Sequence, residues 1–181
     1  LKRAISAMPV AGSYRSIDFA LSSMSNSHIQ KVAVLTQYNA RSLNEHLSSS
    51  KWWDFGRKQG GLYVFTPVVT ADNSNWYRGT ADAIYQNIDF LKRSHEPYVV
   101  IASGDCVYKM DYNKLLEYHI DKKADITVVC KDMPENVNVD RYGIIKMNEE
   151  SRIEEFDEKP MIAKTNTVSC GIYVIRRRLL I

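Results

Sequence analysis

The chain has 181 residues, of which 45% are hydrophobic and 25% charged, and its formal net charge is +3. This composition is typical of a soluble globular domain and excludes the disordered, collagen-like and disulfide-scaffold classes. The nearly balanced charge does not favour nucleic acid or an anionic membrane as a partner. No apolar run is long enough for a transmembrane helix, so no membrane partner is expected.

From residue 17 to residue 130, short apolar runs alternate with amphipathic stretches. The apolar runs predict strands at residues 32–35, 62–65, 98–102 and 126–130. The amphipathic stretches predict helices at 17–24 and 40–47, a long helix capped by Thr80 that continues through Leu91, and a helix capped by Asp111. This alternation predicts an α/β fold with a mostly parallel, Rossmann-like sheet flanked by helices.

After Cys130 the pattern changes to short strands in quick succession, at residues 142–147, 152–156 and 168–175. Turn-forming residues separate them, which predicts a short antiparallel extension of the sheet. The three cysteines are widely spaced and form no CxxC pair. Reduced thiols in a cytoplasmic protein are therefore expected.

One candidate site is the Ser103–Gly104–Asp105 segment, which directly follows the apolar strand predicted at 98–102. Ligands of open α/β sheets bind outside the carboxyl ends of the strands, and a carboxylate there suits a Mg²⁺ ion that is also held by nucleotide phosphates. A turn aspartate that caps the next helix explains the same residues equally well.

Two further stretches have a chemical interpretation. Residues 76–83 place aromatic residues, an arginine and a glycine before a helix N-terminus, which favours an anion or a base but also fits a capped helix with surface aromatics. Residues 155–160 carry three acids beside a lysine. They suit a sugar and its phosphate, although a solvated turn is the more common reason for such a run.

In this order, these stretches resemble the ADP-glucose pyrophosphorylase family, the glucose-1-phosphate adenylyltransferases of glycogen and starch synthesis. The resemblance covers essentially the whole chain. The stretches that carry it, with the family motifs, are residues 9–19 (PFGGKYRxIDF), 21–27 (LSNxxNSGI), 35–38 (LTQY), 76–83 (WYRGTADA), 103–112 (SGDHIYKMDY), 141–144, 156–160 and 169–173.

The resemblance implies roles for residues at matching positions. Asp105 corresponds to the catalytic aspartate, which binds Mg²⁺, and Tyr77 to the site for ATP or ADP-glucose. The positions for glucose 1-phosphate are Gly143, Glu158, Lys159 and Ser169, with Lys159 facing the sugar phosphate. The positions associated with an allosteric effector are Lys2 and Arg3, with Gln37 and Trp76 on loops that relay its signal.

Three positions depart from the family pattern. Ile5 replaces the active-site lysine, Ser13 replaces the lysine of the GGK motif, and Cys106 replaces the histidine after the catalytic aspartate. An alkyl side chain cannot hold a phosphate charge, so Ile5 removes an electrostatic contact in the transition state. The pattern resembles the regulatory second subunit of bacterial glycogen synthesis, a cytoplasmic partner of a catalytic pyrophosphorylase subunit in a hetero- or homotetramer.

The resemblance also implies that residues 1–181 are a partial nucleotidyltransferase domain. A glycine-rich phosphate loop is expected before Leu1, and a second metal-binding aspartate and a C-terminal β-helix domain are expected after Ile181. This piece alone is therefore not expected to be active. A fully catalytic pyrophosphorylase subunit remains an alternative. Another sugar-1-phosphate nucleotidyltransferase is a weaker one, because the WYRGTADA and YKMDY stretches argue against it.

Overall fold

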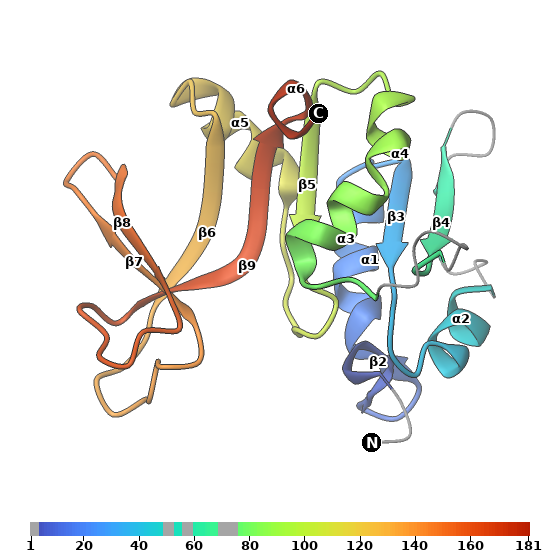
Figure 1. The fold of residues 1–181 in the computed structure, drawn as a ribbon, viewed down its shortest axis with the longest axis horizontal. Coiled ribbons are helices and arrows are strands. Elements are labelled where there is room, and N and C mark those ends of the chain that lie inside the picture. Colours follow the sequence, from blue (N-terminus) through green and yellow to red (C-terminus); the bar gives the residue numbers. More distant parts are fainter. Residues whose placement is uncertain (1–3, 49–52, 56–59, 69–75) are drawn as a thin grey trace.

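The structure is a computed structural model that describes residues 4–48, 53–55, 60–68 and 76–181 (Figure 1). In chain order the elements are η1 (Ile5–Ala7), β1 (Pro9–Val10), β2 (Tyr14–Arg15), α1 (Ser16–Asn26), β3 (Lys31–Leu35), α2 (Arg41–Ser48), β4 (Gly61–Phe65), α3 (Thr80–Gln86), α4 (Ile88–Lys92), β5 (Tyr98–Ala102), α5 (Tyr112–Asp121), β6 (Ile126–Asp132), β7 (Gly143–Met147), β8 (Ile153–Glu158), β9 (Thr167–Arg176) and α6 (Arg177–Leu180). Each apolar run that predicted a strand forms one. The mixed α/β fold is thus confirmed.

The sequence predicted a mostly parallel sheet. Among the described strands, one pair is parallel and the other pairs are antiparallel. β3 and β4 pair in parallel, from Lys31 opposite Gly61 to Leu35 opposite Phe65. The other large sheet has the order β5-β9-β7-β8, with β6 also paired to β9, and all its pairs are antiparallel. The reason is that β9 returns between β5 and β6 and runs opposite to both, so these two strands do not meet. Of the three strands of the predicted antiparallel extension, β7 and β8 form a hairpin, whereas β9 lies between β5 and β6 and joins this hairpin to them.

A bulge divides β9 into two parts. Ile172 is opposite Val129 of β6, but the next pair joins Ser169 to Cys130, so Cys170 and Gly171 are extra residues on β9. Gly171 has a φ of 68°, in the left-handed region that glycine adopts without steric cost. Figure 1 shows β9 bending on its way from the hairpin β7–β8 to the side of β5.

The helix that was predicted from Thr80 through Leu91 is two helices, α3 and α4, and its N-cap is Gly79 rather than Thr80. The break lies at Asn87. Its side-chain amide donates to the carbonyl of Ala83 at 2.8 Å, four residues earlier. Asparagine side chains that bond nearby backbone groups compete with the helical pattern. The prediction that Asp111 caps α5 is confirmed, because its side chain accepts a hydrogen bond from the backbone N–H of Asn113 at 3.0 Å.

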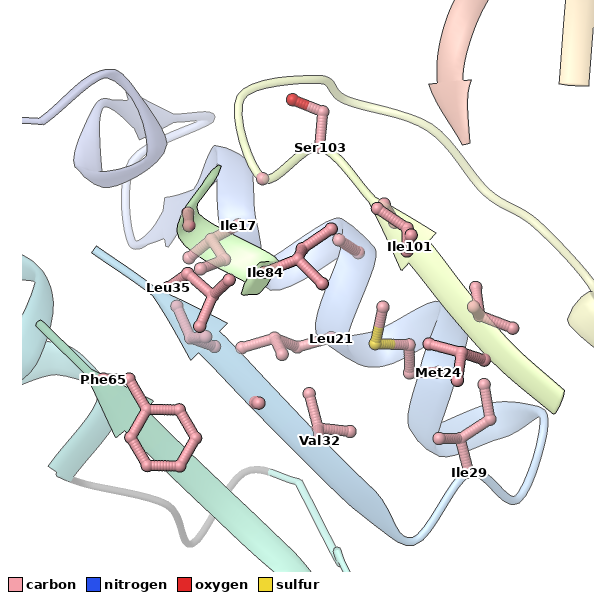
Figure 2. A pocket seen from close by; sticks show the side chains of 18 of the residues that line it. Ile17, Leu21, Met24, Ile29, Val32, Leu35, Phe65, Ile84, Ile101 and Ser103 are labelled. Atoms are coloured by element: carbon pink, nitrogen blue, oxygen red, sulfur yellow. The ribbon is translucent and has the colours of Figure 1, made fainter. Parts of the chain in front are cut away.

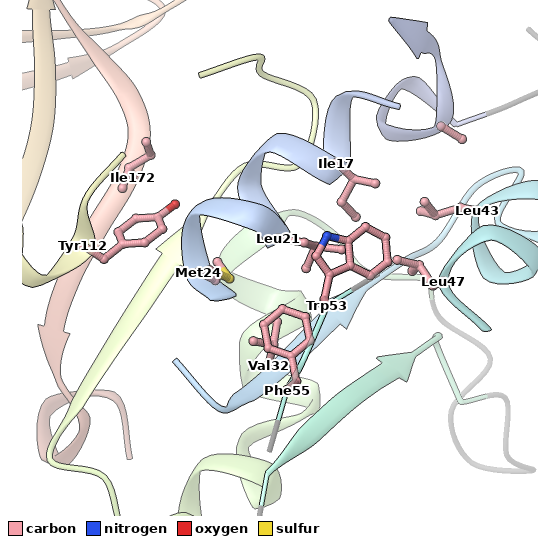
Figure 3. Packing of buried hydrophobic residues seen from close by; sticks show 11 residues of the cluster. Ile17, Leu21, Met24, Val32, Leu43, Leu47, Trp53, Phe55, Tyr112 and Ile172 are labelled. Atoms are coloured by element: carbon pink, nitrogen blue, oxygen red, sulfur yellow. The ribbon is translucent and has the colours of Figure 1, made fainter. Parts of the chain in front are cut away.

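The main core lies around α1, whose buried face includes Ile17, Leu21 and Met24. These side chains form one buried cluster with Val32 of β3 and the aromatic residues Trp53 and Phe55 (Figure 3). A second, smaller cluster near β7 contains Val139, Ile144 and Val168. Within the described ranges, no helix is both long and apolar enough to cross a membrane.

Candidate active site

Asp105 is exposed just beyond the carboxyl end of β5, where the sequence predicted a ligand. Its Oδ1 atom accepts a hydrogen bond from the hydroxyl of Ser103 and a weak one from the Cys106 thiol at 3.5 Å. Partial burial, and then the negative charge of Asp105, raise the pKa of the Cys106 thiol, so this group stays protonated and acts as a donor. The carboxylate is thus held from one side and open to solvent on the other.

The loop that carries Asp105 lies against the start of the described chain. A Cβ atom on Gly104 would lie 3.3 Å from the Ser6 hydroxyl and 3.4 Å from Ile17, so a glycine permits this close approach. The neighbour of Ser6 is Ile5, which is 59% exposed. Ile5 and Asp105 line the same cavity of about 910 Å³. Ile5 and Asp105 thus belong to two segments that meet at Ser6 and Gly104.

A second part of the site joins Tyr77 to Gln37, which are 40 residues apart in the chain. The backbone N–H of Tyr77 donates to Gln37 Oε1 at 2.6 Å, and Gln37 Nε2 donates to the Tyr77 carbonyl at 3.3 Å. The Tyr77 hydroxyl also accepts a hydrogen bond from Asn87 Nδ2 at 2.9 Å. The position predicted for the nucleotide is thus held directly by one that was predicted to relay an effector signal.

Exposed aromatic rings extend this part of the surface. Trp76 is 56% exposed and Tyr38 64% exposed, and their rings stack with 5.2 Å between centroids and 15° between planes. The predicted pair Gln37 and Trp76 therefore comes together on two adjoining loops. Lys2 and Arg3, the other predicted effector residues, lie outside the described residues.

The residues predicted for glucose 1-phosphate gather on β7, β8 and β9. Gly143 is opposite Glu158 in the β7–β8 ladder, and Ile144 is opposite Val168, which places Ser169 beside them. A Cβ atom on Gly143 would lie 2.7 Å from the Phe156 ring and 3.2 Å from Glu158 Oε2, so only glycine fits without a shift. The fold therefore brings all these positions together.

Glu158 and Lys159 are exposed and form an ion pair at 3.4 Å. The backbone of Lys159 has a φ of 49°, and its N–H donates to the carbonyl of Tyr142 at 3.1 Å. This turn ends β8 and points the chain away from the ladder. Both side chains remain available to a ligand, because an exposed ion pair of this kind holds them only weakly.

A chain of hydrogen bonds connects the two halves of the site. The Ser169 hydroxyl accepts from the N–H of Gly171 at 3.3 Å, and the Gly171 carbonyl accepts from the N–H of Ser103 at 3.2 Å. Ser103 in turn bonds Asp105. Sequence reasoning did not assign Ser103, Asn87 or Gly171 a role. Ser103 belongs to the predicted segment 103–105 and Gly171 to the matched stretch 169–173, but no local pattern indicated the bonding partners of these residues or of Asn87.

The carboxylate oxygens of Asp105 are ligands of the kind that Mg²⁺ takes. No group of three or more His, Cys, Asp or Glu side chains that could hold a metal occurs in the described part of the chain. Mg²⁺ usually takes one or two carboxylates and completes its shell with water and substrate phosphates. A single exposed carboxylate at the carboxyl end of a strand fits this mode and does not fit a metal held by protein groups alone.

The mixed α/β fold is that of a nucleotidyltransferase domain. A profile of the family described as "Nucleotidyl transferase" matches residues 1–181, and the chain belongs to this family.

Within the family, the chain is similar to proteins named glucose-1-phosphate adenylyltransferase. It is 45% identical to the one from Clostridium novyi over 96% of the chain and 45% of that relative. It is 46% identical to the one from Clostridium kluyveri over 99% of the chain and 46% of the relative, and 45% identical to the one from Bacillus cytotoxicus over 96% and 46%. The chain thus spans about half the length of these relatives. The resemblance to the ADP-glucose pyrophosphorylase family is confirmed.

Proposed function

We propose that the full-length protein is a glucose-1-phosphate adenylyltransferase-type subunit of glycogen synthesis that is regulatory or weakly active. The reaction of such a subunit is ATP + glucose 1-phosphate to ADP-glucose + pyrophosphate. Similarity to the named relatives along nearly the whole chain supports the reaction class. The observation that supports the regulatory role is Ile5, an apolar and exposed side chain on the wall of the cavity that Asp105 lines.

In this reaction a phosphate oxygen of glucose 1-phosphate attacks the α-phosphorus of ATP, and pyrophosphate leaves. Catalysis rests mainly on positioning and electrostatics. Asp105 would hold Mg²⁺, which supplies positive charge to the phosphates as negative charge develops. Tyr77 is fixed by Gln37 and Asn87 and would orient the nucleotide.

The sugar side of the site would use the exposed pair of Glu158 and Lys159, the first toward sugar hydroxyls and the second toward the sugar phosphate. The absence of a side chain at Gly143 leaves room for the Phe156 ring and the Glu158 carboxylate, which would place Glu158 for the sugar. Ser169 would contribute a hydroxyl. Residues 1–181 would then form most of one nucleotidyltransferase domain, with a phosphate loop and a β-helix domain in the rest of the protein.

The proposed weakness comes from the missing cations. Ile5 cannot donate to or neutralise a phosphate, and Ser13, which is also exposed, carries no charge. The subunit would instead act on a catalytic pyrophosphorylase partner in a cytoplasmic tetramer. Gln37 and Trp76 would transmit the state of an effector bound near Lys2 and Arg3. The direct bonds between Gln37 and Tyr77 support this route, because they connect that loop to the nucleotide position.

The deciding experiment measures ADP-glucose synthesis by the full-length protein alone and mixed with its catalytic partner. We expect little turnover alone and a change in the partner's activity or effector response on mixing. Robust turnover alone would favour the second candidate, a fully catalytic subunit, which the presence of Asp105, Glu158 and Lys159 supports. Turnover with another sugar 1-phosphate but not with glucose 1-phosphate would point to a different nucleotidyltransferase.

The Ile5→Lys variant tests the stated cause of weak turnover. A lysine here would place a cation on the cavity wall near Asp105, and we expect turnover of the full-length protein to rise by roughly 10-fold or more, the scale of one lost electrostatic contact. Ile5→Met is the matched control, since it changes shape without adding charge. No rise in Ile5→Lys would shift the cause to Ser13 or Cys106.

A further inference from the structure

The segment that joins β5 to α5 is attached to helix α1 by two serine side chains. Residues 103–111, which we call the β5–α5 segment, form neither a strand nor a helix. Their backbone N–H groups therefore need partners outside regular structure. The N–H of Met110 donates to the Ser23 hydroxyl at 3.2 Å. The N–H of Tyr112, the first residue of α5, donates to the Ser27 hydroxyl at 2.9 Å.

Both serine hydroxyls are buried, so water does not readily replace them. Ser23 is 4% exposed and Ser27 is 5% exposed, and they lie on one face at the end of α1. The N–H of Tyr112 is one of the donors that the start of a helix leaves without an intrahelical partner. The side chain of Asp111 caps the N–H of Asn113 instead. A buried donor without a partner is costly, so the Ser27 hydroxyl holds the start of α5 against the end of α1.

A pair of tyrosines fixes the same part of the segment. The hydroxyl groups of Tyr108 and Tyr112 are 2.7 Å apart and share a hydrogen bond. Burial raises the pKa of both phenols, so both stay protonated and one donates to the other. Tyr112 belongs to the main core, and Tyr108 and Met110 pack against it. The segment is thus attached at alternate residues toward α5, whereas residues 105–107 are exposed.

The start of α1 holds the other end of the segment. A Cβ atom on Gly104 would lie 3.4 Å from Ile17. Figure 2 shows Ile17 and Ser103, the residue before Gly104, among the side chains that line one pocket. Ile17 and Ser27 are about 15 Å apart along the helix, at about 1.5 Å per residue. The chain from Gly104 to Tyr112 could span about 26 Å when extended. Its path is therefore set by its attachments and not by its length.

We propose that Ser27, assisted by Ser23, is a positioning residue that holds Asp105 in place for a Mg²⁺–nucleotide complex. This inference rests on the role of Asp105 in the proposed function. Among the described residues, the side-chain hydrogen bonds of Asp105 are with Ser103 and Cys106 of the same segment. The carboxylate therefore moves with the segment, and the bonds to α1 fix where the segment lies. Because Mg²⁺ demands nearly ideal octahedral geometry, a small displacement of this ligand weakens binding.

The test measures ATP binding by the full-length protein as a function of Mg²⁺ concentration. In Ser27→Ala, we expect the half-saturating Mg²⁺ concentration to rise by roughly 3- to 10-fold, the scale of one hydrogen bond. Ser27→Thr keeps the hydroxyl and should lie closer to the parent. Ser25→Ala is the matched control and should leave the Mg²⁺ requirement unchanged. It makes the same change on α1, at a side chain without a bond to the β5–α5 segment among the described residues.

Amide hydrogen exchange separates positioning from a general loss of stability. In Ser27→Ala, we expect exchange at residues 106–112 to become at least about 10-fold faster, with little change in β3 and β6. A merely structural serine would instead speed exchange throughout the core and leave the Mg²⁺ requirement of the folded protein unchanged, and that result overturns the proposal. If Ser27→Ala does not fold, Ser23→Ala, at the longer of the two bonds, provides the same comparison.

The Mg²⁺ titration also separates this proposal from the proposed function. If the parent protein binds no ATP in a Mg²⁺-dependent manner, the proposed nucleotide site is wrong, and the role assigned to Ser27 is wrong with it. If the parent binds ATP with Mg²⁺, and Ser27→Ala binds equally well at every Mg²⁺ concentration, only the positioning role is wrong.

Discussion

The layer built on α1 and the hairpin β7–β8 carry the two halves of the proposed site, but they are stabilised in different ways. The core around α1 takes buried residues from η1, α1, β3, α2, α5 and β9. The hairpin contributes Ile144 to a small cluster with Val139 and Val168 and also buries Ile145, whereas its Ile153 and Phe156 remain exposed. The nucleotide side therefore depends on long-range burial, whereas the sugar side depends on local strand register.

The charged side chains of the two regions also differ in burial: those of the hairpin are exposed, and those near α1 are largely buried. Lys146 and Lys164 both contact Glu155 on the outer face of the hairpin, and their hydrogen bonds and charge lower the pKa of that carboxyl. Near α1, the Asp18 carboxylate is largely buried, accepts from the N–H of Arg15 at 2.9 Å, and lies 2.6 Å from His46. Polar groups in the layer link buried elements, while those on the hairpin are solvated.

A substitution in the core around α1 should destabilise the protein most. Leu21→Ala in the full-length protein should lower the free energy of unfolding by about 2–5 kcal/mol, because Leu21 is fully buried in the main core and its truncation leaves a cavity. Phe156→Ala, at a ring that is 43% exposed on the hairpin, should cost distinctly less. Chemical denaturation measures both, and equal losses would contradict the contrast between the regions.

A substitution in the hairpin should affect ligand binding as well as stability. Gly143→Ala introduces a Cβ atom 2.7 Å from the Phe156 ring, and we expect a cost of about 1–3 kcal/mol together with weaker binding of glucose 1-phosphate. In Gly79→Ala the new Cβ meets nothing within 4 Å, so a smaller change is expected. Calorimetric titration with glucose 1-phosphate provides the readout; unchanged binding in Gly143→Ala would remove this strand from the proposed sugar site.

The junction between the regions should make stability pH-dependent. His119 on α5 is 1% exposed, and its Nδ1 lies 2.7 Å from Thr127 Oγ1 of β6. Burial, and then the charge of Arg176, lower the pKa of His119 below its ordinary value. Below about pH 6.5 the unfolded chain binds a proton that the folded chain does not, so stability is complete above that pH and falls as the pH decreases.

The expected slope is at most about 1.4 kcal/mol per pH unit for this one proton. Urea denaturation at pH 7.5, 6.5 and 5.5 measures it. His119→Gln keeps a polar side chain without a titrating ring, and its stability should vary less over this range. An equal pH dependence in the variant would assign the effect to other groups.

The smallest expected effect concerns the link between the two halves of the site. Ser103→Ala removes the hydroxyl that orients Asp105, and we expect Mg²⁺-dependent nucleotide affinity to fall by roughly 2- to 10-fold, the scale of one hydrogen bond. Ser103→Thr retains the hydroxyl and should bind nearly as well as the parent. Fluorescence titration of the full-length protein measures the affinity, and equal affinity of all three proteins would exclude the positioning role.

How much of this site was predictable depended on how local each signal was. Asp105 follows the apolar run at 98–102, and both features lie within one short stretch of chain, so its place at the carboxyl end of β5 was predicted. The bonds of Tyr77 to Gln37 and Asn87 were not, because they join three separate elements. The single helix predicted from Thr80 was wrong because the Asn87 side chain competes with the helical backbone, which apolar periodicity does not report.

By itself, the sequence determined the strands, most of the helices and the family, because apolar spacing, capping residues and motifs are local patterns. Only the tertiary structure decided which strand edges pair. β9 returns between β5 and β6, and β3 pairs in parallel with β4. Strand pairing joins residues far apart in the chain, and it is selected by the burial of whole faces rather than by any one segment.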